Sequence, residues 1–227
     1  MDHILTEHGL RLVYLRDGNA IAGLDHDRIL TDLSDDPPGL IRHQWSECDH
    51  LVLVTDRTTG RHLAFLAAND GATAQEGFLQ LETAFVAPFA RGQNLMRRMI
   101  AFAMLRIGGI AATPTVIAAC SRDRICHRIM RDTASRFTGA LFFPTLDSTV
   151  IDFRAATLAQ RIAHAIEPNC RFYAATGIIH GAMMVATGTD YHRPLSQSAG
   201  RMLTLLDLRG QDEATILNDA RRVYRSR

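Results

Sequence analysis

The sequence contains no lysine, and it has a single tryptophan among its 227 residues. All 25 side chains of fixed positive charge are therefore arginine, whose planar guanidinium group suits contacts to phosphate. An excess of one charge is lacking too, because 24 acidic residues bring the formal net charge to +1. No overall field then attracts nucleic acid or an anionic membrane surface, and we expect neither as a partner.

Cysteine pairs with the spacing of metal ligands are also absent. The four cysteines are Cys48, Cys120, Cys126 and Cys170, and no two histidines are spaced as H-x-x-x-H. We therefore expect no metal site and a protein with reduced thiols. No apolar run reaches membrane-spanning length, and the first residues, M-D-H-I-L-T-E-H, lack the pattern of a secretory signal. These absences favour a cytoplasmic protein.

What the sequence does have is an apolar fraction of 47%, enough for a substantial core, and clear periodic patterns. Strands are predicted over residues 10–16, 51–55, 62–68, 79–86 and 115–120, with a last strand pair over 140–143 and 149–153. Helices are predicted over residues 25–33, 39–45, 95–107, 124–137, 157–166, 202–208 and 212–224. A polar loop is expected over 69–77, and residues 172–191 follow no assignable pattern.

The most informative stretch is residues 78–109, where a strand pattern, a short turn and a long helical pattern follow one another. The run 79–86 is apolar at most positions, which is typical of a central strand covered on both faces. The turn carries Arg91-Gly92, and the helical pattern begins a few residues later. Exposed backbone N–H groups and the positive end of a helix dipole meet at such a junction. The stretch therefore predicts a site for phosphate.

Within this stretch, V-A-P-F-A-R-G-Q-N-L-M over residues 86–96 resembles the acyl-CoA-binding motif of the GNAT superfamily of N-acyltransferases. That motif has a valine, any residue, a proline and two further residues, followed by Arg-Gly-x-Gly-x-Gly or Ala. Val86, Pro88 and Arg91-Gly92 fit it in register, whereas Asn94 and Met96 replace the two later glycines. Asparagine tolerates the left-handed backbone conformation and preserves the loop, whereas a methionine side chain crowds a closely bound pyrophosphate.

The resemblance covers residues 51–153 in the order of its elements. It implies an α/β GNAT-like domain over residues 1–154, with a mixed, mostly antiparallel sheet flanked by helices. Residues 155–227 have no counterpart in the resemblance, and their patterns predict a largely helical C-terminal extension that packs on this domain. The resemblance also implies acetyl-CoA or another acyl-CoA as cosubstrate. The residues that the resemblance places at this donor are Phe85, Val86, Arg91, Gly92, Gln93, Asn94, Leu95 and Met96. An amide near Val86 would polarise the thioester carbonyl.

Attack of an amine on a thioester requires a base, and family members often carry it in the central strand. Glu82 is our candidate; the alternative is that it forms an ion pair with an arginine beside the strand. The tyrosine that many members use as general acid is missing, since Met130 stands at its position. His127 is the candidate in its place, although histidines at such positions are more often structural. Arg97 and Arg98 either meet the adenosine 3′-phosphate or form a solvated helix face.

The sequence thus predicts an N-acetyltransferase or other acyltransferase that moves an acyl group from acyl-CoA to a small-molecule amine or a peptide amine. One alternative is an N-acyl amino acid or acyl-homoserine-lactone synthase-like enzyme that uses acyl carrier protein, suggested by W-S-E-C-D at residues 45–49. Another is a noncatalytic acyl-CoA sensor or interaction protein. A homodimer formed through the tail is also considered.

Overall fold

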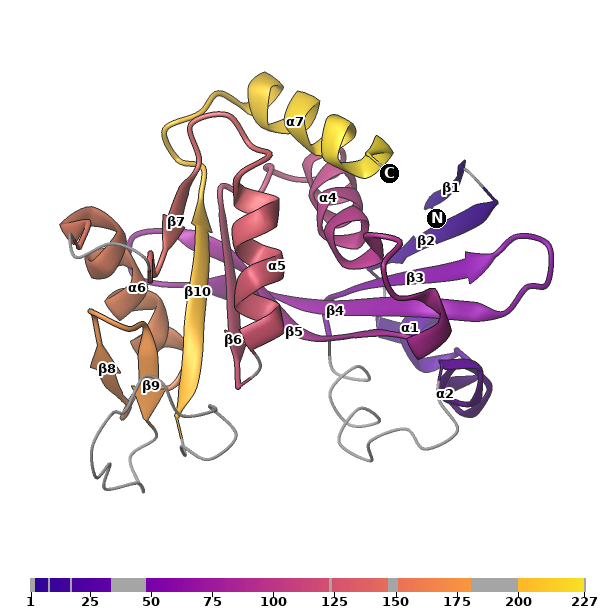
Figure 1. The fold of residues 1–227 in the computed structure, drawn as a ribbon, viewed down its shortest axis with the longest axis horizontal. Coiled ribbons are helices and arrows are strands. Elements are labelled where there is room, and N and C mark those ends of the chain that lie inside the picture. Colours follow the sequence, from indigo (N-terminus) through magenta and orange to yellow (C-terminus); the bar gives the residue numbers. More distant parts are fainter. Residues whose placement is uncertain are drawn as a thin grey trace. The chain divides into compact units, whose positions relative to one another are not determined.

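The computed structural model describes residues 3–7, 9–16, 18–33, 48–122, 124–146, 151–180 and 200–226. The chain divides into two compact units, which are described separately. Unit 1 comprises Met1–Asn69, Leu81–Thr113 and Glu213–Arg227, and unit 2 comprises Asp70–Gln80 and Pro114–Asp212. Each unit contains strands covered by helices (Figure 1). The helix predicted over residues 39–45 lies outside the described residues. So do residues 181–191, the later part of the stretch that followed no assignable pattern.

The sheet of unit 1 runs in the order β1-β2-β3-β4-β5. Its strands are β1 (His3–Glu7), β2 (Leu10–Leu15), β3 (His50–Asp56), β4 (His62–Ala72) and β5 (Gly77–Val86), of which the last two continue into unit 2. The pairs β1–β2, β2–β3 and β3–β4 are antiparallel. The four strands predicted here are confirmed, and β1 adds a strand that the sequence patterns missed.

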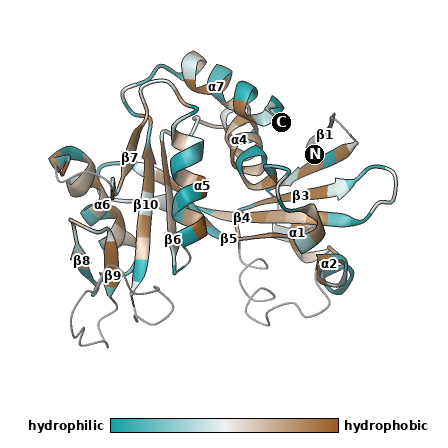
Figure 2. Cartoon of the chain, in the orientation of Figure 1, coloured by the Kyte–Doolittle hydropathy of each residue, from teal (hydrophilic) through white to brown (hydrophobic). Residues whose placement is uncertain are grey.

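The helices of unit 1 are α1 (Gly18–Ala22), α2 (His26–Leu33), the short 3-10 helix η1 (Pro88–Ala90), α4 (Leu95–Gly108) and α7 (Glu213–Arg225). Helix α4 packs against β2 and β3, and α7 packs along α4 (Figure 1). The contact between α4 and α7 includes the rings of Phe102 and Tyr224, whose centroids are 5.7 Å apart. Brown, apolar stretches dominate the strands beneath these helices (Figure 2).

One expectation for the central strand is wrong. Residues 79–86 were expected to be covered on both faces, but only Phe78 and Leu79 of β5 are fully buried. Each residue of the run Gln80–Val86 is partly exposed, including the apolar Phe85 and Val86. The strand therefore presents apolar side chains and backbone that the described structure does not cover completely.

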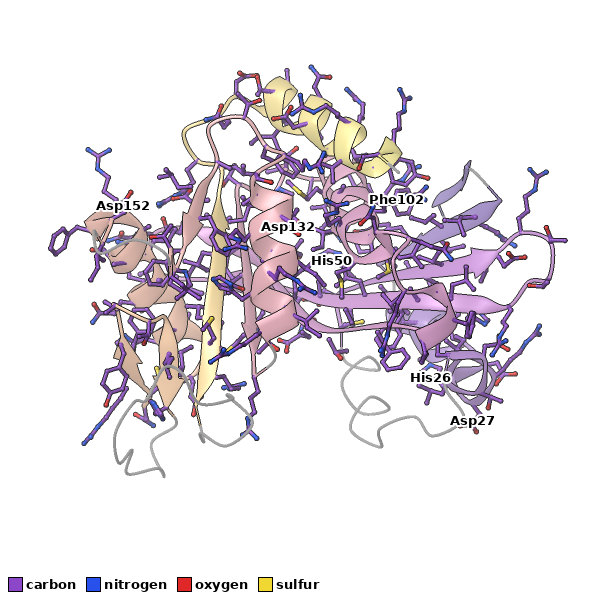
Figure 3. The ribbon with its side chains drawn as sticks, in the orientation of Figure 1. His26, Asp27, His50, Phe102, Asp132 and Asp152 are labelled. Atoms are coloured by element: carbon purple, nitrogen blue, oxygen red, sulfur yellow. The ribbon has the colours of Figure 1, made fainter. Side chains whose placement is uncertain are left out.

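Unit 2 is built around β10 (Arg201–Asp207), which pairs along one edge with β6 (Val116–Ser121). The two ends of β10 pair with β9 (Ile178–His180) and β7 (Leu141–Phe143), and β8 (Arg171–Tyr173) follows β9. All these pairs are antiparallel. Helices α5 (Arg124–Ala134) and α6 (Phe153–Ile166) pack on β10, and Asp152, labelled in Figure 3, caps α6 through the backbone N–H groups of its first turn.

Two expectations fail in unit 2. Residues 202–208 were expected to be helical but form β10, whose interior residues are buried on both faces. A buried strand and a buried helical segment of this length have the same apolar pattern, so periodicity does not separate them. The predicted strand 149–153 is also absent: Ile151 and Asp152 are irregular, α6 begins at Phe153, and residues 149 and 150 lie outside the described ranges. The partner of β7 is β10 instead.

An ion-pair cluster in unit 2 fastens the tip of the β4–β5 hairpin. The carboxylate of Glu76 accepts hydrogen bonds from Arg161 of α6 and from Arg209, which follows β10. Arg209 also donates to Asp207 at 2.7 Å, and this bond raises the pKa of the guanidinium above its usual value. Two arginines and two carboxylates therefore balance one another, which fits a structural role.

The predicted fold class is confirmed, because both units combine mostly antiparallel strands with flanking helices. The two compact units differ from the predicted domains over residues 1–154 and 155–227, because α7 belongs to unit 1 and α6 belongs to unit 2. Among the described helices, none combines the length and apolar character needed to cross a bilayer.

Candidate functional site

The turn before α4 has the backbone geometry of an anion-binding loop. Gly92 has φ of 83° and Asn94 has φ of 57°, so two of three consecutive residues adopt the left-handed conformation. A Cβ atom added at Gly92 would meet nothing within 4 Å, so it is the backbone conformation and not space that favours glycine there. The prediction that Asn94 preserves the loop in place of glycine agrees with this geometry.

The N–H groups of this turn are not used by the rest of the described structure. The first bond of the helix runs from the N–H of Arg98 to the carbonyl of Asn94 at 3.1 Å, and no side chain caps the helix. Across residues 92–97, no N–H group has an acceptor among the described residues. Six consecutive donors thus lie at the positive end of a helix dipole, an arrangement that favours a phosphate or pyrophosphate group.

The loop is anchored on both sides. Leu95, 3% exposed, and Ala90, 1% exposed, point into the core of unit 1, and the N–H of Ala87 donates to the carbonyl of Leu63 at 2.9 Å. The anchors fix the backbone, whereas Arg91, Gly92 and Gln93 between them are exposed. Met96 is partly buried in the first turn of α4.

A second set of contacts fastens the start of β4 beside this loop. The guanidinium of Arg61 lies 4.0 Å from the centroid of the Phe89 ring, and its Nε donates to the carbonyl of Asp32 at 3.1 Å. The Nδ1 atom of His62 lies 2.7 Å from Oδ2 of Asp32. Burial opposes ionisation of Asp32, but the hydrogen bonds and charge of His62 outweigh it and hold the pKa of Asp32 below its usual value.

Glu82 lies in the part of β5 that belongs to unit 1, and its side chain is partly exposed. Its Oε1 atom accepts a hydrogen bond from the side-chain amide of Asn69 on β4 at 3.4 Å. By the alternation of a strand, Glu82 shares a face with Val86, four residues further along. The candidate base therefore belongs to the same unit as the loop, and it is accessible to a reactant.

Arg98 departs from both sequence-based interpretations. Its side chain is 6% exposed, and its Nε donates to the carbonyl of Tyr224 in the last turn of α7 at 3.0 Å. Such a cation at a helix C-terminus is stabilised by the helix dipole. Arg98 thus belongs to the packing of α4 against α7, and it is neither solvated nor exposed to a ligand.

His127 belongs to unit 2, whereas the other predicted site residues belong to unit 1. It is 7% exposed on α5, its Nε2 lies 3.1 Å from the carbonyl of Pro144, and its ring packs edge-on against Phe142. These contacts describe a histidine that packs within its unit. A hollow of about 400 Å³ is lined by Arg131 and Ala134 of α5, by Ser135 in the turn after it, and by the segment around Phe142; none of the predicted site residues lines it.

Other titratable groups add little chemistry. Burial raises the pKa of the Cys48 thiol to about 11, so this cysteine stays protonated and unreactive at neutral pH. Within the described ranges, no group of three or more His, Cys, Asp or Glu side chains is placed to hold a metal ion.

Asn69, which contacts Glu82, was not predicted from the sequence as a residue of the candidate site. An asparagine followed by Asp and Gly indicates a loop, so no role was expected for it.

The chain was also compared with known proteins. No family model matches it, and no curated protein sequence matches it. Solved structures of similar fold include the ribosomal-protein-S5-alanine acetyltransferase from Vibrio fischeri, at 10% identity and a TM-score of 0.39, with 63% of this chain and 85% of that chain covered. An agmatine N-acetyltransferase shows 10% identity and a TM-score of 0.42, with 86% of this chain and 98% of that chain covered.

A GCN5-related N-acetyltransferase from Brucella melitensis shows 13% identity and a TM-score of 0.39, with 97% of this chain and 85% of that chain covered. These similarities concern the fold alone, and each TM-score is below 0.5.

Proposed function

We propose that the protein is an acyltransferase that moves an acyl group from acetyl-CoA or another acyl-CoA to an amine. The observation that carries the proposal is the turn before α4, where six consecutive N–H groups have no acceptor among the described residues. Two left-handed residues, Gly92 and Asn94, shape this turn, and both lie within the motif of residues 86–96 that resembles the acyl-CoA-binding sequence.

The proposed donor site extends from this turn along β5. The N–H groups from Gly92 to Met96 hold the pyrophosphate, and the exposed guanidinium of Arg91 adds positive charge beside it. The partly exposed backbone of Phe85 and Val86 runs beside the pantetheine arm. The Met96 side chain leaves less room than the small residue of the family motif, so we expect weaker donor binding than a glycine or alanine would give.

The proposed reaction is direct attack of the amine nitrogen on the thioester carbon. Glu82 accepts the proton that the amine loses, directly or through a water molecule. A backbone N–H near Val86 stabilises the negative charge that develops on the carbonyl oxygen. The nitrogen–carbon bond forms, the carbon–sulfur bond breaks, and coenzyme A leaves as a thiolate. This leaving group needs little assistance, so the buried position of His127 does not prevent the reaction.

The acceptor is proposed to be a small-molecule amine or a peptide amine. The segments expected to recognise it are the early helical region and the loop after β7, of which residues 34–47 and 147–148 lie outside the described residues. Most of the W-S-E-C-D cluster that suggested an acyl carrier protein enzyme lies there as well. A cytoplasmic location and a homodimer remain predictions.

A noncatalytic acyl-CoA-binding protein is the second candidate. The observations that favour it are the partly buried Met96 in the loop and the packing of His127 against Pro144 and Phe142. Such a protein would bind the donor through the same turn but would not depend on Glu82.

The deciding experiment combines calorimetric titration of coenzyme A with an assay of thiol release from acetyl-CoA over a panel of amines. We expect Glu82→Gln to keep its affinity for coenzyme A and to lose turnover by about 10²–10⁴-fold, the usual contribution of a general base. Thr83→Ala, a change at the next residue of the strand, is the matched control and should keep most of its activity.

The outcomes separate the candidates. Binding of coenzyme A without turnover of any amine favours the noncatalytic protein, and unchanged turnover in Glu82→Gln removes that residue from the mechanism. Binding of an acyl carrier protein in place of coenzyme A contradicts the proposed donor.

A further inference from the structure

Asn69 uses both ends of its side-chain amide. The Oδ1 atom accepts a hydrogen bond from the backbone N–H of Asp49 at 2.9 Å, and Nδ2 donates to Oε1 of Glu82 at 3.4 Å. A carboxamide has its acceptor on one side and its donors on the other. The bond from Asp49 therefore determines which end of the amide faces Glu82, and it is the donating end.

The backbone of two paired strands holds this amide in place. His50 of β3 pairs with Ala68 of β4, so Asp49 and Asn69 lie one position beyond that pair. His50, labelled in Figure 3, is itself held in place: it is 1% exposed, its Nδ1 atom lies 2.8 Å from the hydroxyl of Tyr14, and the two rings stack. Asn69 thus projects from a rigid part of unit 1 and not from a loop.

We infer that Asn69 is a positioning residue for the carboxylate of Glu82. The inference deepens the proposed function and rests on it, because it matters only if Glu82 accepts the proton of the amine. Asn69 itself exchanges no proton; it donates to one carboxylate oxygen and restricts rotation of the side chain. Both residues are partly exposed, as expected of a base that must reach a reactant.

The physical reason is geometric and electrostatic. A hydrogen bond to an ionised carboxylate is stronger than one between neutral groups, so it holds the carboxylate more firmly in one orientation. A carboxylate held in one rotamer also spends more of its time in line with the attacking nitrogen. Both effects act on the rate of the chemical step, and neither acts on affinity for the donor.

The test uses two substitutions with different consequences for the fold. Asn69→Ala removes both bonds of the amide. Asn69→Asp has nearly the same shape and keeps an oxygen for the N–H of Asp49, but it replaces the donor with a negative charge beside Glu82. If Asn69 had only a structural role, the aspartate would preserve it; if it positions the base, the aspartate should be at least as damaging as alanine.

We expect both variants to lower kcat about tenfold, the scale of one hydrogen bond, with the affinity for coenzyme A unchanged. When Glu82 is already glutamine, neither substitution should reduce the residual rate further, as required of two residues that act as one unit.

Three results would overturn the inference. Wild-type kcat in Asn69→Asp, while Glu82→Gln is inactive, would show that the base does not need the hydrogen bond from Asn69. An equal loss for Asn69→Ala in the wild-type and Glu82→Gln backgrounds would show a structural effect. Full activity of Glu82→Gln, or no turnover by the wild-type protein with any amine, would remove the proposed function and the inference with it.

Discussion

The two ends of helix α4 differ in what their polar groups do. At the N-terminal end, residues 91–93 are exposed, and the N–H groups of residues 92–97 have no acceptor among the described residues. Further along the helix, each residue from Met99 to Met104 is at most 1% exposed, and α7 covers the surface that these residues form. Arg98 lies between these two parts of the helix, and its Nε donates a hydrogen bond to the carbonyl of Tyr224.

The difference shows how one helix supports two tasks. Burial of the middle turns fixes the helix axis, so that the backbone groups at its first turn keep a defined direction without a side-chain cap. A cap would satisfy these N–H groups and occupy the space in front of them. We therefore expect substitutions after Arg98 to change mainly the stability of the protein, and substitutions before Arg98 to change mainly the binding of coenzyme A.

The largest effect is expected from Phe102→Ala. Phe102 is 0% exposed and packs against Tyr224, so its removal leaves a cavity between α4 and α7. The free energy of unfolding, measured with urea, should fall by about 3–5 kcal/mol, while the folded variant keeps its affinity for coenzyme A. Ile110→Ala, at a residue 50% exposed, is the control and should change stability by less than about 0.5 kcal/mol.

Arg98→Met should have the next largest effect. It tests whether Arg98 belongs to the buried part of α4 or to the exposed end that is proposed to bind the donor. The substitution keeps most of the buried chain but removes the hydrogen bond to the carbonyl of Tyr224, which should cost about 1.5–3 kcal/mol of unfolding free energy. The affinity for coenzyme A, measured by calorimetry, should stay within about twofold, since less than about 0.4 kcal/mol of binding free energy is at stake. Weaker binding with full stability would instead place Arg98 at the donor.

At the exposed end of α4, a substitution of Asn94 should change coenzyme A binding more than it changes stability. Valine disfavours the left-handed conformation by about 1–2 kcal/mol, so Asn94→Val should weaken coenzyme A binding about tenfold with a small effect on stability. Asn94→Gly, which accepts this conformation freely, should bind at least as well as the wild type. Equal affinities of the two variants would show that the loop conformation does not determine donor binding.

The smallest effect is expected at Asp32, which joins α2 to the start of β4 beside the loop. Its pKa is lowered in the folded protein, so its contribution is complete at neutral pH and is lost as the pH falls below about 4. Asp32→Asn should therefore be less stable than the wild type by about 0.5 kcal/mol at pH 6, and the difference should shrink as the pH falls below about 4. Thermal unfolding across this pH range measures it; a difference that grows on acidification would contradict the assignment.

The features that were predicted correctly from the sequence depend on residues close together in the chain. The turn before α4 follows from the residues themselves: glycine and asparagine tolerate the left-handed conformation, and the structure has φ above zero at Gly92 and Asn94. The strands of unit 1 were found by their apolar runs. Contacts with distant segments were not predictable, because the partner of Arg98 lies 126 residues further along the chain.

Other misses have the same origin. Residues 202–208 carry an apolar pattern compatible with a helix, and only pairing with β6, β7 and β9 makes them a strand. The polar run from Asn69 indicated a loop, yet β4 continues to Ala72. This continuation places the amide of Asn69 beside Glu82, so the same error hid a residue of the candidate site.

The order of the chain has a consequence for how the protein is made. Unit 1 begins with the first strands, but its last helix, α7, follows the whole of Pro114–Asp212, which forms most of unit 2. On the ribosome, the apolar surface of α4 must therefore wait uncovered while unit 2 is synthesised. During that interval the surface of α4 that α7 later covers stays exposed, so we expect this part of the nascent chain to be prone to aggregation.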